Sequence, residues 1–553
     1  MKAGLAGRDP VHSLISMATF PALLQDMVQP PPNRLSLFQV AIVLIAGCAH
    51  AASMAWPFSF GLSQGAPLGW LQVLALGLLA AQLDGCRSWR RAAWLGGLFA
   101  TAMLCATFWW LFISLHVYGG LAAPLTVLAV VLLAVFLGLY YAAAAVLFVV
   151  LSPAHRALRA LVFAALWLLA ELARVKLFTG FPWGEGGYAH VDGWARPLAS
   201  WVGVHGLTFI AAFVAAALAF SVRAGRRRWP AALALVVLGT LLARLPVQGV
   251  PSFNSTETAQ PGTLTVTLLQ GNIAQNEKFQ SGTGVLDALR WYGKELRDAR
   301  SALVVAPETA LPLLPEQLPE GYWAALQSRF ASGQQAALIG VPLGSFEAGY
   351  SNSVLGLKPN PSGAAVAPPP YRYDKHHLVP FGEFVPPGFR WFIDLMHIPL
   401  GDFNRGTVGQ PSFDWQGQRL APNICYEDLF GEELGARFMD PAQAPTIFVN
   451  VSNIAWFGNT VAIDQHLQIS RMRALEFARP MIRATNTGAT VIIDHLGQVT
   501  HSLPRHTRGA LVGDVQGRNG ITPYAWWAAR YGLWPLWLLC LAVAGLALLR
   551  RLR

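Results

Sequence analysis

Long apolar segments fill the first part of this chain and return near its C-terminus. A helix that crosses a bilayer needs about 20 mostly apolar residues, and eight segments approach that length. They lie at approximately 37–56, 66–83, 93–117, 121–152, 157–175, 198–222, 229–247 and 531–549. The pattern predicts a multi-span α-helical membrane domain with about eight spans.

A different pattern occupies residues 262–520, where short β-rich runs alternate with amphipathic helical stretches. Strands are expected at 264–273, 302–308, 336–343, 353–358, 420–427, 446–453, 489–494 and 510–515. Helices are expected at 284–300, 320–332, 428–438 and 462–479, the last with apolar residues spaced for one buried face. The alternation predicts a single α/β domain outside the membrane.

Domain boundaries follow from these two patterns. Residues 1–247 are expected to form the membrane domain with spans one to seven. Residues 248–525 are expected to form the extramembrane domain, and residues 526–553 span eight and a basic tail.

Composition supports the membrane assignment. Hydrophobic residues make up 54% of the chain and charged residues 12%, whereas charged residues average about 25% in soluble proteins. A net charge of +11 is compatible with a nucleic-acid partner, but the arginines cluster at the ends of the apolar runs. We therefore expect no nucleic acid, and we attribute the basic residues to membrane topology and anionic headgroups.

The basic clusters also predict an orientation. They follow span two, separate spans four and five, separate spans six and seven, and end the chain: Arg87, Arg90, Arg91, Arg156, Arg159, Arg223, Arg226, Arg227, Arg228, Arg550, Arg551 and Arg553. Eight alternating spans put all of them on one side, which the positive-inside rule makes the cytoplasm. The extramembrane domain is then expected on the periplasmic side of a bacterial inner membrane, with both termini in the cytoplasm.

The segment 384–406 is apolar and aromatic, yet proline and glycine interrupt it. One interpretation is a packed surface loop. The other is a lid, including Trp391, that dips into the bilayer surface and guards an opening. The sequence leaves both open.

Three reactive side chains each follow a strand-like run: Glu308 in VVAPET, Lys375 in YRYDKHHLVPFGE and Cys425 in NICYED. Cys425 is far from the other cysteines, which all lie in or beside apolar segments. A thiol needs a base or a cation to become a nucleophilic thiolate. A carboxylate can take its proton, and an ammonium can stabilise the oxyanion that forms on a carbonyl.

Each residue also has a simpler interpretation, because Glu308 alone could be a turn residue and Lys375 alone a solvated lysine. His376 and His377 invite a metal hypothesis. Neighbouring histidines in an extended chain point in different directions, and the chain has no H-E-x-x-H or C-x-x-C spacing. We therefore expect no metal and no cofactor, and we expect the two histidines to anchor the Lys375 loop.

Several motifs carry a family resemblance: FTGFPW (178–183), QGNI (270–273), PETA (307–310), KHHLVPFGE (375–383), NICYE (423–427), NVSN (450–453), AWFG (455–458), QHLQ (465–468), RMRALE (471–476) and RATNTG (483–488). The chain resembles the nitrilase superfamily, whose Glu-Lys-Cys triad sits in an αββα sandwich. More narrowly, it resembles the membrane-integrated branch of that superfamily, the apolipoprotein N-acyltransferases.

The resemblance implies roles for individual residues. Glu308 is expected as general base, Lys375 as oxyanion support and Cys425 as the acylated nucleophile. The supporting residues are expected to be Glu383, Tyr426 and Glu427, and the gating or substrate-binding residues Phe279, Trp391, Trp456 and Phe457. The chain departs from the family pattern at Ile454, where an aspartate is usual, and at Phe279, where a tryptophan is usual.

The resemblance also implies an activity. A fatty acyl chain would pass from a membrane phospholipid to the N-terminal amino group of the diacylglyceryl-modified cysteine of an apolipoprotein, the last step of lipoprotein maturation. A thioester on Cys425 would carry it, with ping-pong kinetics. Two alternatives stay open: a membrane-tethered nitrilase-like amidase that uses water, and a transporter or receptor whose polar domain binds ligand without chemistry.

Overall fold

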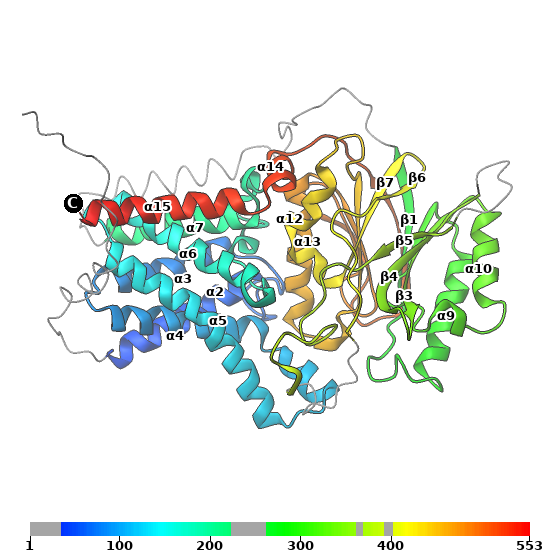
Figure 1. The fold of residues 1–553 in the computed structure, drawn as a ribbon, viewed down its shortest axis with the longest axis horizontal. Helices are drawn as coiled ribbons and strands as arrows, with labels where there is room; N and C mark the ends of the chain where they lie inside the picture. Colours follow the sequence, from blue (N-terminus) through cyan, green and yellow to red (C-terminus); the bar gives the residue numbers. More distant parts are fainter. Residues whose placement is uncertain (1–34, 223–261, 361–368, 392–401, 553) are drawn as a thin grey trace, which may run out of the picture.

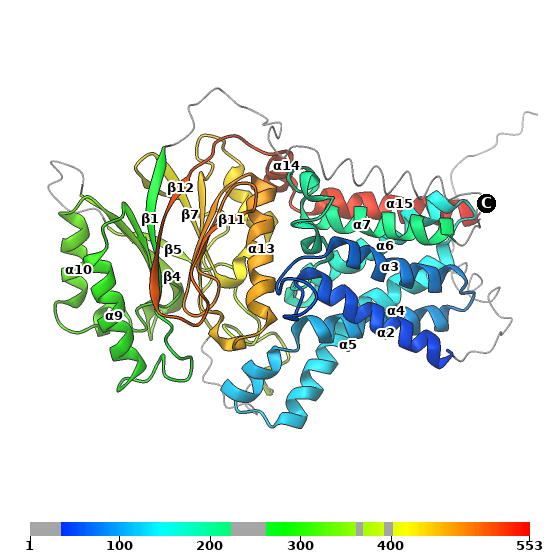
Figure 2. The same ribbon diagram turned by 180° about the vertical axis from the view of Figure 1, so that it is seen from behind.

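The computed structural model describes residues 35–222, 262–360, 369–391 and 402–552. A bundle of long helices lies at one end and an α/β body at the other (Figures 1 and 2). The last helix returns from the α/β body and lies along the bundle. The two patterns of the sequence therefore correspond to two regions of the molecule.

The bundle consists of α2 (Leu37–Met54), α3 (Gly69–Asp84), α4 (Trp89–Phe108), α5 (Ala123–Leu151), α6 (Arg156–Lys176), α7 (Ala199–Val222) and α15 (Trp534–Leu552). In the described part of the chain, five segments are long and apolar enough to span a membrane: Leu37–Met54, Trp89–Phe108, Ala123–Leu151, Arg196–Val222 and Trp534–Leu552. Helix α3 is apolar but only 16 residues long, and α6 carries several charged residues. The predicted span 229–247 lies outside the described residues.

Small residues let the bundle helices approach closely. A Cβ added to Gly47 of α2 would lie 2.3 Å from the main-chain oxygen of Phe99 in α4. A Cβ on Gly96 of α4 would lie 2.9 Å from the oxygen of Tyr141 in α5. Because lipid provides no hydrophobic drive between helices, such close packing is what holds membrane helices together.

The α/β body contains two six-stranded mixed sheets. The first has the order β12 (Gly509–Gln516), β1 (Thr263–Gln270), β2 (Leu303–Val305), β3 (Ala336–Ser345), β4 (Gly349–Leu357), β5 (Tyr371–Asp374). The second has the order β11 (Val499–Ser502), β10 (Val491–Ile493), β9 (Met481–Thr485), β8 (Ile447–Ser452), β7 (Gln418–Ile424), β6 (Phe413–Trp415). Strands β1, β2 and β3 run parallel to one another, as do β7, β8 and β9.

The sheets pack face to face through one apolar cluster that includes Val266, Leu303, Leu338, Ile424, Val449 and Ile482. Helices α9 (Gly284–Asp298) and α10 (Tyr322–Ala331) cover the outer face of the first sheet (Figure 1). Helices α13 (Val461–Phe477) and α14 (Pro523–Tyr531) cover the outer face of the second. These four layers form the predicted αββα sandwich.

Several predicted elements differ in detail. Strands β6, β9 and β11 were not expected, since they are three to five residues long and carry weak alternation. Strand β5 is the strand-like run before Lys375. The predicted helix 428–438 is broken into the 3₁₀ turn Cys425–Leu429, the short α12 (Gly431–Gly435) and a further turn. The predicted boundary at residue 526 falls inside α14.

Helix α13 corrects a further expectation. The sequence predicts one buried face, but nearly every residue of this helix is buried. The reason is its position between the second sheet and the membrane bundle (Figure 2). The side chain of Gln465 accepts hydrogen bonds from the indoles of Trp110 at 3.0 Å and Trp183 at 2.8 Å, and donates to the oxygen of Thr107 at 3.0 Å. Polar residues on this face therefore bond to the membrane domain instead of water.

Candidate active site

Cys425 is the first residue after strand β7 and begins the 3₁₀ turn. Its φ of 52° lies in the left-handed region, a conformation that costs a non-glycine residue about 1–3 kcal/mol and is concentrated at functional sites. The turn is held at the main-chain oxygen of Cys425, where Asn450 Nδ2 and His466 Nε2 each lie 3.3 Å away. The thiol is thus presented by a strained but anchored turn.

Glu308, Lys375 and Glu383 form one buried cluster beside this turn. Lys375 Nζ lies 2.8 Å from Glu383 Oε1 and 3.4 Å from Glu308 Oε1. Asn352 of β4 donates to both carboxylates, at 2.7 Å to Glu308 and 2.9 Å to Glu383. Residues separated in sequence therefore share a single hydrogen-bond network.

One hydrogen bond joins this cluster to the second sheet. The main-chain N–H of Asn453, just after β8, donates to Glu308 Oε2 at 2.8 Å. Since β8 is the neighbour of β7, this bond brings the carboxylate to the sheet edge that carries Cys425. The carboxyl ends of parallel strands are the usual place for an α/β active site.

Burial, more than the charges of the cluster, keeps the Cys425 thiol protonated at rest. Burial raises the pKa of Cys425 to about 12, and the carboxylate of Glu308 adds to the rise, while the ammonium of Lys375 opposes it. Burial alone would lower the pKa of Lys375, but the carboxylates of Glu383 and Glu308 outweigh it and raise that pKa. Lys375 is therefore an ammonium at neutral pH.

Glu308 is a carboxylate. Burial acts to raise its pKa, but Lys375, Lys278 and the hydrogen bonds from Asn352 and Asn453 lower it overall. A proton can pass from a thiol to a carboxylate only when the thiolate gains stabilisation, for example as it attacks a carbonyl. The Cys425 thiol can therefore become a nucleophilic thiolate when a carbonyl is present, with Glu308 as proton acceptor and Lys375 as cation.

Glu427 braces the same turn. Its carboxylate accepts hydrogen bonds at 2.7 Å from the N–H of Ile424, the N–H of His376 and the hydroxyl of Tyr373. Burial opposes ionisation, but His376 and these donors lower the pKa of Glu427 to about 2. Glu427 therefore joins the cysteine turn to the Lys375 loop as a permanent anion.

The two histidines anchor the Lys375 loop, as expected. His376 Nε2 lies 3.0 Å from a carboxylate oxygen of Glu433, and His377 Nδ1 lies 3.0 Å from the same oxygen. Among the described residues, no group of three or more His, Cys, Asp or Glu side chains is placed to hold a metal ion.

Known proteins resemble both regions of the chain. The family model "Apolipoprotein N-acyltransferase N-terminal domain" matches residues 35–217, and the model "Carbon-nitrogen hydrolase" matches residues 265–523. An apolipoprotein N-acyltransferase of Verminephrobacter eiseniae is 61% identical over 511 residues, which cover 90% of this chain and 94% of that protein. The chain belongs to the apolipoprotein N-acyltransferase family. The resemblance predicted from the motifs is confirmed.

Another member of the apolipoprotein N-acyltransferase family, from Ralstonia nicotianae, is 44% identical and covers 82% of this chain and 85% of its own length. A solved amidase from Nesterenkonia sp. is 15% identical, with a TM-score of 0.34, and covers 52% of this chain and 100% of its own. The protein is an N-acyltransferase of the nitrilase superfamily that carries membrane helices.

Two of the expected gating residues contact the membrane domain, and the other two are exposed. Phe457 packs on Trp110, with ring centroids 4.2 Å apart, and Trp456 meets Tyr118 edge to face at 5.7 Å. Both contacts reach the membrane domain. Phe279 and Trp391 are 58% and 64% exposed. Residues 392–401 of the possible lid lie outside the described residues.

Tyr426 and the substituted position Ile454 are both buried in the apolar cluster that continues into the membrane bundle. The ring of Tyr426 packs edge to face on Phe430, with centroids 5.3 Å apart. Its hydroxyl is buried and has no hydrogen-bond partner among the described residues. Tyr426 therefore lies where the catalytic turn meets apolar surface.

No role was predicted for three buried polar residues of the cluster, Lys278, Asn352 and Asn453, although Asn453 ends the motif NVSN. Lys278 Nζ donates to the main-chain oxygen of Glu308 at 3.1 Å. A lysine among polar turn residues looks solvated in sequence, and an asparagine in a strand looks like an edge residue. Only the fold shows that all three are buried against Glu308.

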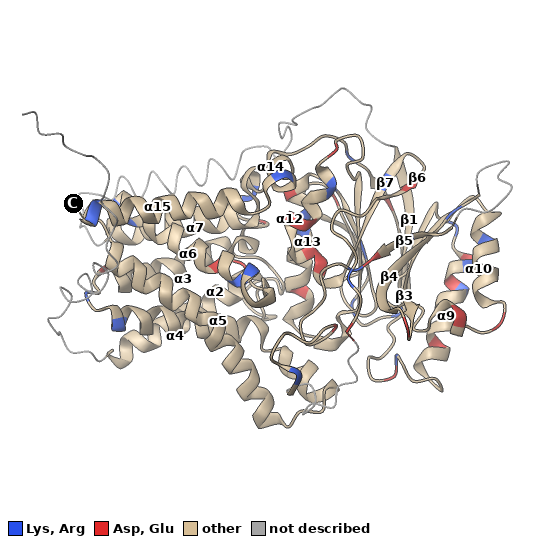
Figure 3. Ribbon diagram, in the orientation of Figure 1, with Lys and Arg blue, Asp and Glu red and all other residues tan. Residues whose placement is uncertain are grey.

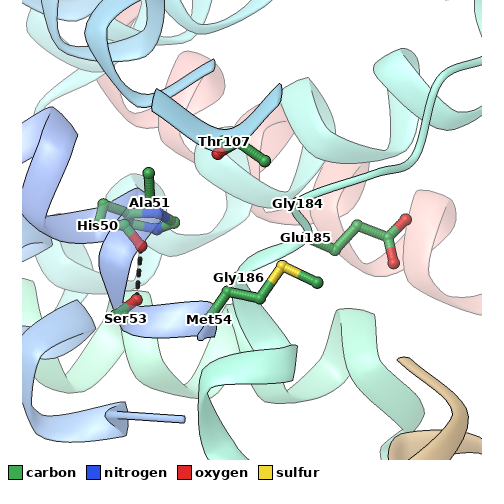
Figure 4. A pocket seen from close by; sticks show the side chains of 8 residues that line it. All are labelled: His50, Ala51, Ser53, Met54, Thr107, Gly184, Glu185 and Gly186. Carbon is green, nitrogen blue, oxygen red and sulfur yellow. Dashed lines mark hydrogen bonds between the residues drawn. The ribbon is translucent and has the colours of Figure 1, made fainter. Parts of the chain in front are cut away.

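A small enclosed space lies apart from this cluster, inside the membrane domain (Figure 4). It is too narrow to hold a water molecule, and its lining includes His50, Ser53, Thr107 and Glu185. The carboxylate of Glu185 extends away from the His50 ring. None of the predicted site residues lines this space.

Proposed function

We propose that the protein transfers a fatty acyl chain from a membrane phospholipid to the N-terminal amine of the diacylglyceryl-modified cysteine of apolipoproteins, through a thioester on Cys425. The observation that carries the proposal is the buried cluster of Glu308, Lys375 and Glu383 beside the strained Cys425 turn. Base, cation and nucleophile are all required for acyl transfer through a covalent intermediate. No cofactor or metal is needed.

The first step forms the thioester. Cys425 Sγ attacks the ester carbonyl carbon of the phospholipid while Glu308 takes the thiol proton. Lys375 stabilises the negative charge that develops on the carbonyl oxygen. The ester C–O bond then breaks, Glu308 returns the proton to the departing oxygen, and a lysophospholipid leaves.

The second step forms the amide. The amine of the lipoprotein attacks the thioester carbon, and Glu308 accepts a proton from the amine. The C–S bond breaks, and the sulfur leaves and is reprotonated as the thiol. The phospholipid forms the covalent intermediate and leaves before the amine reacts with it, and this order gives ping-pong kinetics.

The contact between the site and the bundle supports lipid substrates. Phe457 follows the segment that binds Glu308, and it packs on Trp110 and Trp183 of the membrane domain. Gln465 fixes the same two tryptophans. We infer that the nucleophile works close to the bilayer surface, within reach of phospholipid and lipoprotein acyl chains.

An intact mass measurement tests the function. Purified protein mixed with phospholipid in detergent is expected to gain the mass of one fatty acyl chain and to hold it. Addition of a diacylglyceryl-modified peptide is expected to remove that mass and to place it on the peptide amine. Rapid loss of the adduct in water alone, with free fatty acid as product, would instead show a hydrolase. Absence of any adduct would refute the proposed intermediate.

We also propose the full topology of eight spans, with the α/β domain in the periplasm and both termini in the cytoplasm. Basic residues lie at the C-terminal end of α15 and beside α4, at the end of the bundle remote from the α/β body (Figure 3). This charge distribution supports that orientation by the positive-inside rule.

A reporter that is active only in the periplasm tests the orientation. Fused after Asn360, between β4 and β5, it is expected to be active. The same reporter fused after Asp84, between α3 and α4, is the matched control and is expected to be inactive. The opposite pair of results would reverse the orientation.

A further inference from the structure

We propose that Lys278 is a second cation of the active site, which positions Glu308 and balances the negative charge that forms around Cys425 during acylation. The inference deepens the proposed function and rests on it. The observation behind it is a buried ammonium that the mechanism above does not use. Lys278 is 2% exposed, and burial of an ammonium costs several kcal/mol unless charge and hydrogen bonds compensate it.

Lys278 contacts the main chain of Glu308, the proposed base. Its Nζ donates to the main-chain oxygen of Glu308 at 3.1 Å. An ammonium has three donors, and among the described residues this oxygen is the one acceptor recorded for Nζ.

The segment that carries Lys278 is fixed to the second sheet. The side chain of Asn486 binds the main chain of Ile273 twice, accepting from its N–H at 3.0 Å and donating to its oxygen at 2.8 Å. Asn453, whose N–H holds Glu308, also donates through its side chain to Gln275 at 2.8 Å. Lys278 is therefore held in the same network as the base, as a positioned charge should be.

The charges around it explain why a second cation is needed. Glu308 and Glu383 supply two carboxylates, and Lys375 alone supplies one ammonium. Moving the thiol proton to Glu308 leaves this excess of negative charge in place, next to the oxyanion that develops on the substrate. Lys278 makes the cluster neutral, which lowers the free energy of that state.

The proposal predicts a pH dependence of its own. Burial lowers the pKa of Lys278 to about 8, although Glu308 and the Cys425 sulfur act to raise it. Lys278 is then charged below pH 8 and loses its charge as the pH rises through that value. Acylation should be fastest with the charge present, so its rate should fall as the pH rises through about 8.

The test is single-turnover acylation of the full-length protein in detergent, with phosphatidylglycerol as donor and intact mass as readout, between pH 6 and pH 10. This half-reaction contains no acceptor amine, and the donor headgroup carries none. Lys278→Met is expected to slow acylation at pH 7 by roughly 10- to 100-fold and to remove the fall near pH 8. Lys278→Arg, which stays charged throughout, is expected to retain more activity than Lys278→Met and also to lack that fall.

Lys294→Met is the matched control, because this lysine is exposed on α9; it is expected to keep the wild-type rate and profile. If Lys278→Met does not fold, the Lys278→Arg profile still decides. A fall near pH 8 that persists in Lys278→Arg, or wild-type acylation by Lys278→Met, would overturn the inference while leaving the proposed function intact. Failure of the wild-type protein to form any acyl-enzyme would remove both.

Discussion

Replacement of Cys425 by alanine is expected to abolish acyl transfer, with a loss of roughly 10⁴- to 10⁶-fold in turnover. Alanine removes the sulfur that would carry the acyl group. His466 and Asn450 contact the main-chain oxygen of residue 425 and not the side chain. The turn should therefore persist, so the variant should fold and fail only in chemistry.

The measurement combines product formation with the mass of the protein after incubation with phospholipid. Wild-type protein should carry an acyl adduct that neutral hydroxylamine removes, and Cys425→Ala should carry none. Cys48→Ala is the control, since this cysteine is exposed on α2 and should retain both adduct and activity. An acyl adduct that survives in Cys425→Ala would place the nucleophile elsewhere.

Replacement of Glu308 by glutamine is expected to lower turnover by about 10²- to 10⁴-fold, the usual contribution of a positioned base. Glutamine has nearly the same shape but cannot accept the thiol proton. In the wild-type protein, Asn352 and the N–H of Asn453 donate hydrogen bonds to the Glu308 carboxylate. Glutamine would place its own N–H₂ donor against one of them. Both steps of the transfer should slow, since each moves a proton through Glu308.

Rapid mixing separates the two steps: adduct formation reports thioester formation, and adduct loss with peptide reports amide formation. Glu320→Gln, at an exposed position before α10, should behave as wild type. A Glu308→Gln protein that forms and discharges the adduct at wild-type rates would show that another group carries the proton.

The sequence predicted the main architecture because that information is local. Apolar run length marks membrane helices, and alternation of strands with helices marks the α/β body. Most strands of the sheet interiors, such as β1, β3, β7 and β8, were expected, whereas the short interior strand β9 was not. Strand β9 pairs with both β8 and β10, and a five-residue strand of this kind is recognisable only from its neighbours.

Part of the candidate site was also predicted, but from residue type and family motifs and not from the hydrophobic pattern. Glu308, Lys375 and Cys425 were identified by residue type, position after strands and family motifs. No role was predicted for Lys278 or Asn352. Each is polar and typical of a surface residue until the fold buries it, and their partners lie in other strands and loops.

What the sequence determined by itself is the membrane attachment of the chain and the α/β class of its second region, because each depends on neighbours along the chain. Glu308, Lys375 and Cys425 remain a prediction from residue type, position and family motifs. The tertiary structure alone decided which hydrogen bonds connect the residues of the cluster. It decided that the main-chain N–H of Asn453 donates to Glu308, that Lys278 donates to the main-chain oxygen of Glu308, and that nearly every residue of α13 is buried. These contacts form only when two sheets and a membrane bundle meet, since burial turns a polar side chain from a solvated group into one that needs a specific partner.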